Sequence, residues 1–221
     1  MRKIFLCLLL AGIFAGCSSK RLLKKDAYSH LYREKPLSVL VLPPINRSIK
    51  VEAKEAFYSS LSAPIAQRGY YTLPPLLSMD ILKEESAYDA EMFLDQSMKK
   101  MGEVFSTDAV LFTIIHNWKK SSLAQCIIVE IEYIMKSTAT DEVLFHRIGD
   151  ITVSTSVSTG NPIGDLVASV VVTAMSKEIV AGQRCNLYTF SDLPAGKYHP
   201  SFGQDGMQKA QPKKFRAAVK R

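Results

Sequence analysis

The sequence predicts an α/β (α+β) protein with a single domain, in which a mixed β-sheet is flanked by helices. Two observations indicate this class. In the first half of the chain, apolar strand-like runs alternate with helical patterns, whereas in the second half several strand-like patterns follow one another. The expected order is β-α-β-α-α-β-β-β-α, and no internal repeat or low-complexity tract interrupts it.

The first strand is expected at residues 37–42, an apolar run rich in Val and Leu. Such a run is typical of a strand that is covered on both faces. Pro43 and Pro44 end the strand, because proline has no N–H to donate to a neighbouring strand.

A helix is expected next, at residues 51–68, where apolar residues recur every four positions. Asn46 or Ser48 could cap its start. Pro64 predicts a kink or a helix in two pieces, and Gly69 ends it.

The remaining elements follow from the same patterns. A short strand is expected at residues 70–73, and helices at 76–85 and 91–105. Further strands are expected at 109–118, at 124–136, which alternates clearly, and at 143–153, which we expect to break near Gly149. A last helix at 163–180 is closed by Gly182.

The N-terminus has the pattern of a secretory signal peptide. Arg2 and Lys3 precede an apolar run at residues 4–15. At about 1.5 Å per residue this run is too short to cross a bilayer core of about 30 Å.

The end of this signal resembles a bacterial lipobox. Ala15 and Gly16 precede Cys17, whose thiol would receive a diacylglycerol and whose amine would receive an acyl chain after cleavage. Several acyl chains make a lasting membrane anchor. Ser18, in place of Asp, resembles lipoproteins sent on to the outer membrane. The alternative is an ordinary signal peptide with an incidental cysteine.

These features divide the chain into four parts. Residues 1–16 are the signal peptide, 17–36 the lipidated cysteine with a flexible tether, 37–190 the α/β domain, and 191–221 an irregular basic C-terminal segment. Removing the signal lowers the formal net charge from +7 to +5.

Basic residues gather at the two ends of the mature chain. Those next to the anchor could touch anionic lipid headgroups. Those at the C-terminus are expected to be solvated, irregular chain. The two groups are Lys20, Arg21, Lys24 and Lys25, and Lys209, Lys213, Lys214, Arg216, Lys220 and Arg221. No aromatic-interleaved basic motif is present, so we expect no nucleic acid as a partner.

Two cysteines remain in the mature chain besides Cys17. Cys126 and Cys185 could form a disulfide, which an exported protein permits. Alternatively, both are buried thiols that act as small apolar side chains. The sequence leaves both interpretations open.

No pattern of catalytic or metal-binding residues emerges. The loop after the first strand lacks the glycines of a phosphate cradle, although Asn46 and Arg47 form an exposed corner that could touch a partner. The histidines at 30, 116, 146 and 199 lack metal-ligand spacing, and His116 and His146 lack evident carboxylate partners. Glu130 and Glu132 are expected on a solvated strand face. We therefore expect no enzymatic activity, no metal and no cofactor apart from the lipid on Cys17.

Five segments together resemble a family of bacterial lipoproteins filed as domain of unknown function 799. They are VLVLPPINRS at 39–48, Ala63-Pro64, GYYTLP at 69–74, STDAVLF at 106–112 and GKYHPSFGQDG at 196–206. The resemblance covers residues 37–206. It implies a fold like the N-terminal domain of the Tol-system translocation protein and like curli-channel-type lipoproteins.

The resemblance also implies a role. Its members are outer-membrane lipoproteins, associate as dimers, and are encoded beside a curli-channel-like lipoprotein. We therefore expect a lipid-anchored, periplasm-facing protein of the outer membrane that binds other envelope lipoproteins in a complex for assembly or transport. The alternative is a periplasmic carrier for a small or lipidic ligand, held near residues 43–48 and the loop at 155–164.

Overall fold

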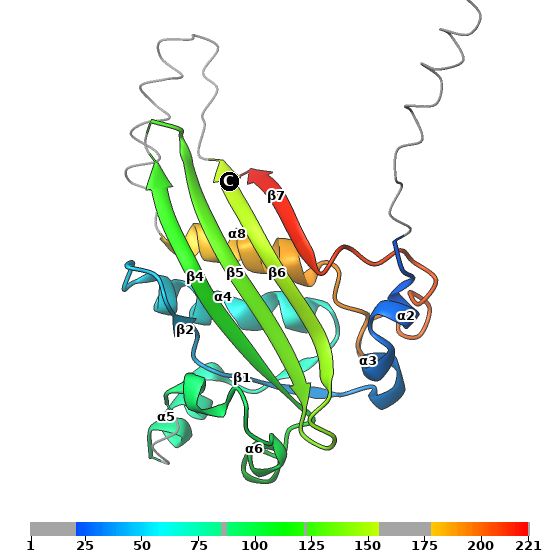
Figure 1. The fold of residues 1–221 in the computed structure, drawn as a ribbon. Coiled ribbons are helices and arrows are strands. Elements are labelled where there is room, and N and C mark those ends of the chain that lie inside the picture. Colours follow the sequence, from blue (N-terminus) through cyan, green and yellow to red (C-terminus); the bar gives the residue numbers. More distant parts are fainter. Residues whose placement is uncertain (1–20, 85–87, 122, 155–177, 221) are drawn as a thin grey trace, which may run out of the picture.

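The computed structural model describes residues 21–84, 88–121, 123–154 and 178–220 (Figure 1). Its strands are β1 (Ser38–Val41), β2 (Ile45–Asn46), β3 (Tyr71–Thr72), β4 (Ala109–Ser121), β5 (Cys126–Ser137), β6 (Val143–Ser154) and β7 (Lys214–Lys220). Its helices are α2 (Lys24–Ala27), α3 (Ser29–Glu34), α4 (Ala53–Gln67), α5 (Pro75–Glu84), α6 (Lys99–Phe105) and α8 (Glu178–Phe190), with the 3-10 helix η2 (Ala90–Phe93).

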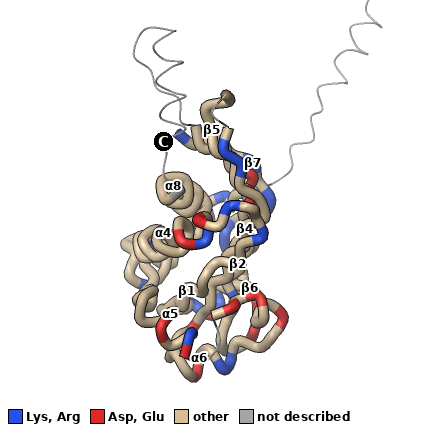
Figure 2. Tube along the Cα trace, turned by 90° about the vertical axis from the view of Figure 1, so that its left-hand side faces the viewer, with Lys and Arg blue, Asp and Glu red and all other residues tan. Residues whose placement is uncertain are grey.

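The strands form one mixed sheet with the order β3-β1-β4-β5-β6-β7, and β2 pairs with β4 beside this path. The pairs β1–β3, β1–β4, β2–β4 and β6–β7 are parallel, whereas β4–β5 and β5–β6 are antiparallel. Figure 2 shows the sheet from its side, with α4 and α8 packed as a second layer. The predicted fold class is therefore confirmed.

The first strand follows its sequence pattern. Val39, Leu40, Val41 and Leu42 are all at most 1% exposed, as expected for a strand covered on both faces. β1 ends at Val41, before the two prolines. The chain then returns to the sheet as β2 instead of entering a helix, so that α4 starts only at Ala53.

Two expectations about the helices are wrong. Pro64 does not divide α4, because it lies in the last turn and only a few residues follow it. Gly182 does not close a helix but lies inside α8. A Cβ at Gly182 would be 2.9 Å from the carbonyl oxygen of Ala56, so this glycine lets α8 approach α4 closely. The expected helix at 163–177 and the loop at 155–164 lie outside the described residues.

Two apolar clusters fill the two sides of the sheet. The larger cluster joins the sheet to α4 and α8 through side chains such as Phe57, Leu61 and Cys185. The smaller cluster covers the lower part of the opposite face, where Leu82, Met98 and Phe112 pack between α5, α6 and β4. The upper part of that face carries no described helix (Figure 1).

The flanking segments belong to the fold, which corrects the expected tether at 17–36 and the expected irregular segment at 191–221. Residues 24–34 form α2 and α3, and Leu31 is buried in the larger cluster. Residues 214–220 form β7 instead of solvated chain. Arg147 of β6 is buried, donates from Nη1 to the Thr189 carbonyl at 2.8 Å, and lies 4.0 Å from the centre of the Phe215 ring of β7.

Buried charges hold these segments in place. The Asp205 carboxylate, 1% exposed, accepts hydrogen bonds from Tyr32 Oη at 2.8 Å, Arg68 Nη2 at 3.3 Å and the Ala195 amide at 2.8 Å. The Lys24 ammonium is 3.8 Å from the same carboxylate. Burial lowers the pKa of Lys24, although Asp192 and Asp205 act in the opposite direction.

A second buried carboxylate acts in the same region. Tyr28 directly precedes α3, and its hydroxyl donates a hydrogen bond to Asp192 Oδ2 at 2.5 Å. The Gln211 backbone amide donates to the same oxygen at 3.0 Å. Backbone bonds also join the two ends, since the Ala210 amide donates to the Leu22 carbonyl at 2.9 Å. The N-terminal and C-terminal segments therefore lie side by side.

We predict that Asp205→Asn lowers the free energy of unfolding by about 3 kcal/mol, because it leaves Lys24 and Arg68 without their buried counter-charge. Glu91→Gln is the matched control. It breaks the exposed ion pair with Arg47 and should cost less than about 1 kcal/mol. Urea unfolding measures both values, and equal losses in the two variants would contradict the role assigned to Asp205.

Candidate functional site: the open face of the sheet

The face of β4–β7 that carries no described helix presents polar and charged side chains. Along β5, buried residues such as Val129, Ile131 and Tyr133 alternate with more exposed residues. The more exposed positions of β5, β6 and β7 include Ile128, Glu130, Glu132, His146, Ile148, Asp150, Thr152, Lys214, Arg216, Ala218 and Lys220. Three strands and an edge strand therefore offer one continuous surface.

Two histidines and one carboxylate meet on this face. His116 Nε2 lies 2.8 Å from one oxygen of Glu132, and His146 Nε2 lies 2.7 Å from the other oxygen. The three residues come from β4, β5 and β6. Their side chains are 28%, 15% and 22% exposed. Glu132 is thus the most buried member and holds both imidazoles.

A β-bulge creates this arrangement. The β4–β5 register shifts between Ile115 and Asn117, so His116 is the extra residue of β4. On the other side, the β5–β6 register places His146 opposite Ile134, two residues from Glu132. His146 therefore reaches Glu132 diagonally across the sheet.

These contacts correct the interpretation of the sequence. His116 and His146 were expected to lack a carboxylate partner, and Glu132 was expected on a solvated face. Instead Glu132 joins the two histidines, while Glu130 is exposed as expected. The two-residue spacing of Glu130 and Glu132 does not indicate that Glu132 binds the histidines, because the bulge in β4 and the β5–β6 register decide which side chains meet.

The cluster is held together by two contacts between an imidazole and a carboxylate oxygen. Among the described residues, no group of three or more His, Cys, Asp or Glu is placed to hold a metal ion. Burial raises the pKa of Glu132, but the hydrogen bonds from His116 and His146 outweigh it, so that the pKa is lowered overall. Glu132 is therefore an anion that the histidines hold in place.

The exposed corner predicted at Asn46 and Arg47 is held within the protein. The Asn46 side chain donates to the Lys50 carbonyl at 2.7 Å and accepts from the Ser48 amide at 3.0 Å. Arg47 Nη2 lies 2.6 Å from Glu91 Oε1, and both side chains remain about half exposed. A contact of this corner with a partner stays a prediction.

The two cysteines of the domain are free, buried thiols. Cys126 starts β5, whereas Tyr133, seven residues further along the strand, donates its hydroxyl to Asn186, the neighbour of Cys185. Seven residues of strand span about 23 Å, and a disulfide needs Cα atoms within about 7 Å. The structure therefore favours the buried-thiol alternative over the disulfide. Cys17 lies outside the described residues.

Three of the cavities in the described part of the chain lie at the margins of the sheet. One of about 520 Å³ lies between α2 and β6 and is lined by residues that include Arg21, Tyr28 and Lys213. Another of about 470 Å³ lies between η2 and α6 and is lined by Leu82, Phe93 and Phe105 among others. A third, of about 380 Å³, lies beside residues 44–46, where the sequence predicted a ligand cleft.

No described helix is long and apolar enough to span a membrane.

Comparison with known proteins identifies the family. A family model described as "Putative lipoprotein GNA1162-like" matches residues 26–199, which is most of the chain. The chain belongs to the GNA1162-like lipoprotein family. The match includes α3, the sheet from β1 to β6, and α8. Membership of the family filed as domain of unknown function 799, and a fold like those of the Tol and curli proteins, remain predictions from the resemblance.

Individual relatives agree with this family. The chain is 29% identical over 94 residues to "Putative lipoprotein NMB1124/NMB1162" of Neisseria meningitidis serogroup B (strain ATCC BAA-335 / MC58). That match covers 42% of the chain and 44% of the relative, so it spans less than half of the relative's length. The crystal structure of lipoprotein GNA1162 from Neisseria meningitidis is 25% identical, with a TM-score of 0.50, over 62% of this chain and 96% of that chain.

Two further solved structures are similar at a lower level. The PelC dodecamer from Paraburkholderia phytofirmans is 10% identical over 74% of this chain and 91% of that chain, with a TM-score of 0.43. The LpoB C-terminal domain from Salmonella enterica is 15% identical over 60% of this chain and 96% of that chain, with a TM-score of 0.36. The GNA1162-like family name describes lipoproteins and names no enzymatic activity.

We predict that Glu132→Gln makes the stability of the fold less dependent on acid pH. Since the folded state lowers the pKa of Glu132, the ionised carboxylate stabilises the fold above its ordinary value of 4.5. This contribution is lost as pH falls through the lower folded pKa. The site is partly exposed, so the loss at pH 7 should be at most about 1 kcal/mol.

Urea unfolding between pH 7 and pH 3 measures this difference. The gap between wild type and Glu132→Gln should close below pH 4.5. Glu130→Gln, on the same strand face but exposed, is the control and should show no such gap. A gap for Glu132→Gln that is equally large at pH 7 and pH 3 would contradict the ionic role.

Proposed function

We propose that this GNA1162-like protein is a non-enzymatic outer-membrane lipoprotein that faces the periplasm and acts by binding other envelope proteins. Membership of a lipoprotein family, together with the lipobox-like residues before Cys17, supports the anchor. The proposed anchor is the diacylglycerol and N-acyl chain on Cys17.

The open face of β4–β7 is the observation that carries the binding role. It presents ionic side chains, half-exposed Ile128 and Ile148, and the ordered His116–Glu132–His146 cluster, without any described helix above it. Protein partners fit such a surface, because ordered charges give specificity and scattered apolar side chains give contact area. The proposed partners are another envelope lipoprotein, in particular a curli-channel-like one, or a second copy of this chain.

A specific observation also favours the alternative, a carrier for a small or lipidic ligand. The cavity between η2 and α6 has a largely apolar lining and the size of a small-molecule site. Its position differs from the cleft that the sequence predicted beside residues 43–48.

For the anchor, we predict that the mature protein starts at Cys17 and carries the mass of the attached lipid. Cys17→Ala should abolish both the added mass and the start of the mature chain at residue 17. Cys7→Ala is the matched control, since it removes a cysteine from the signal peptide but leaves the lipobox intact. Intact-mass measurement provides the readout. An unmodified Cys17 in a correctly exported wild-type protein would refute the anchor.

For the binding role, we predict that a photo-crosslinker on the open face captures an envelope protein or a second copy. Thr152, half-exposed on β6, is a suitable position, and Ser59, exposed on the outer side of α4, is the control. Cells carrying the crosslinker at Thr152 should yield a defined adduct that is absent with Ser59. No adduct at Thr152, combined with a small molecule retained in native mass spectrometry, would favour the carrier instead.

A further inference from the structure

The two basic groups of the sequence, almost two hundred residues apart, lie side by side in the structure. Leu23 forms a β-bridge with Lys209, and the Lys24 and Lys25 amides donate to the carbonyls of Gln208 and Gly206. Arg21 and Lys213 line the same cavity beside β6. Strand β7 continues from this point along the edge of the sheet.

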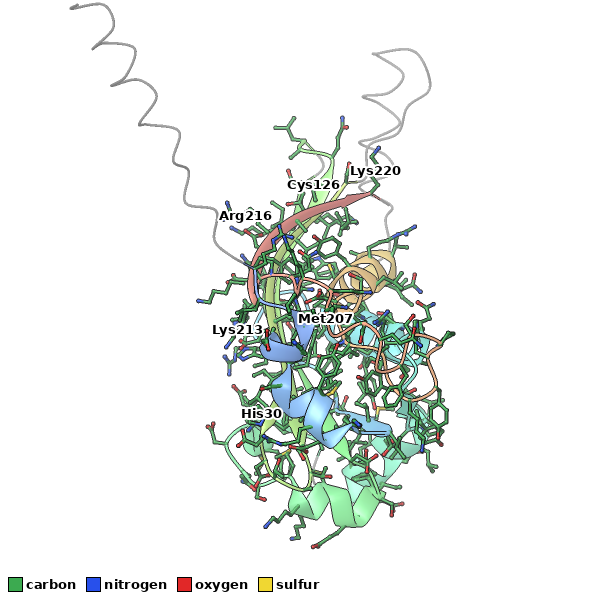
Figure 3. All side chains as sticks on the ribbon, turned by 90° about the vertical axis from the view of Figure 1, so that its right-hand side faces the viewer. His30, Cys126, Met207, Lys213, Arg216 and Lys220 are labelled. Atoms are coloured by element: carbon green, nitrogen blue, oxygen red, sulfur yellow. The ribbon has the colours of Figure 1, made fainter. Side chains whose placement is uncertain are left out.

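Together these segments form a surface that we name the basic edge. It consists of the exposed residues Arg21, Lys25, Lys209, Lys213, Lys214, Arg216 and Lys220. Segments 21–27 and 206–220 contain one acidic residue, Asp26. On the neighbouring strand, Asp150 binds Arg216 at 3.0 Å. Figure 3 shows Lys213, Arg216 and Lys220 along this edge of the molecule. The surface is therefore strongly positive.

The position of the anchor brings this edge to the membrane. The chain is bound to the domain from Leu22 onward, through the bond between its carbonyl and the Ala210 amide. Five residue steps separate Leu22 from Cys17, and they span at most about 18 Å. The part of the domain next to Leu22 thus cannot move far from the lipid headgroups. That part is the basic edge.

Apolar side chains accompany the charges. Leu22 and Met207 are 61% and 69% exposed, and Met207 lies on the side of the molecule shown in Figure 3. Exposed apolar residues flanked by Lys and Arg are typical of surfaces that rest on a bilayer. A soluble acidic partner would match the charges but would leave these two side chains, next to the anchor, unexplained.

We propose that the basic edge binds the anionic phospholipid headgroups of the membrane that holds the anchor. Arg21, Lys25 and Lys209 meet the headgroups first, and β7 extends the contact along the sheet edge. The proposal rests on the proposed anchor for its place in the cell, but binding of headgroups by the basic edge requires no lipid on the protein. The two can therefore fail separately.

The test uses the mature chain, residues 17–221, with Cys17→Ser, which contains every described residue and no lipid. Co-sedimentation is measured at low salt with vesicles of phosphatidylcholine alone and with 30% phosphatidylglycerol. Binding should require phosphatidylglycerol and should fall steeply as salt is raised to 0.5 M, because salt screens exposed charges. Neutralising one basic residue should weaken binding about fivefold.

Two matched variants locate the surface. Lys209, Lys213 and Lys220 changed together to Gln should weaken vesicle binding about 100-fold. Lys83, Lys99 and Lys100 changed to Gln remove the same net charge from α5 and α6, at the other end of the molecule, and should change binding less than fivefold. Thermal unfolding of both variants verifies that they are folded.

Three outcomes would overturn the proposal. The first is no binding to anionic vesicles at low salt. The second is an equal loss in the two triple variants, which would indicate net charge instead of a defined surface. The third is concentration-dependent self-association, measured by sedimentation velocity, that the Lys209/Lys213/Lys220 variant abolishes while vesicle binding is absent. That result would assign the basic edge to contacts between copies.

Discussion

The buried carboxylate of Asp205 joins the parts of this protein that lie furthest apart in the sequence. It accepts hydrogen bonds from Tyr32 and Arg68, and the Lys24 ammonium lies beside it. As a result α2, α3 and the end of α4 are all attached to the C-terminal segment. A buried carboxylate is stable only with such partners. Residues 24–34, which form α2 and α3, are thereby fixed against the domain instead of forming part of a tether. With the anchor proposed at Cys17, this constraint would decide which edge of the sheet comes to the membrane.

The sequence was sufficient for the centre of the fold. The alternation in β5 and the apolar run in β1 identify which residues are buried, because these patterns follow directly from strand geometry. The flanking segments were interpreted wrongly, since Lys24 reads as a solvated basic residue in the local sequence. Its burial depends on Asp205, which follows 181 residues later and approaches only in the folded chain. Local patterns contain no information on such a pairing.

The candidate site shows the same limit at shorter range. His116, Glu132 and His146 were each visible in the sequence, but a one-residue change of register would point any of them to the other face. The bulge at His116 is the feature that turns three ordinary strand residues into one cluster. The cysteines show a pairing that the sequence allowed and the structure disfavours. Their number allowed a disulfide, whereas the strand length between Cys126 and the region of Cys185 does not.

The basic edge and the open face have a geometric relation that links the two proposals. β7 is the outer strand of the sheet, and the open face extends from β7 across β6 and β5 to β4 (Figure 1). A domain that rests on its β7 edge holds the sheet upright on the membrane, so its open face points sideways. Neighbouring lipoproteins in the same membrane can then reach Glu132 and its histidines without displacing lipid. An ionic face is suited to such encounters, because ordered charges select partners while the shared membrane supplies proximity.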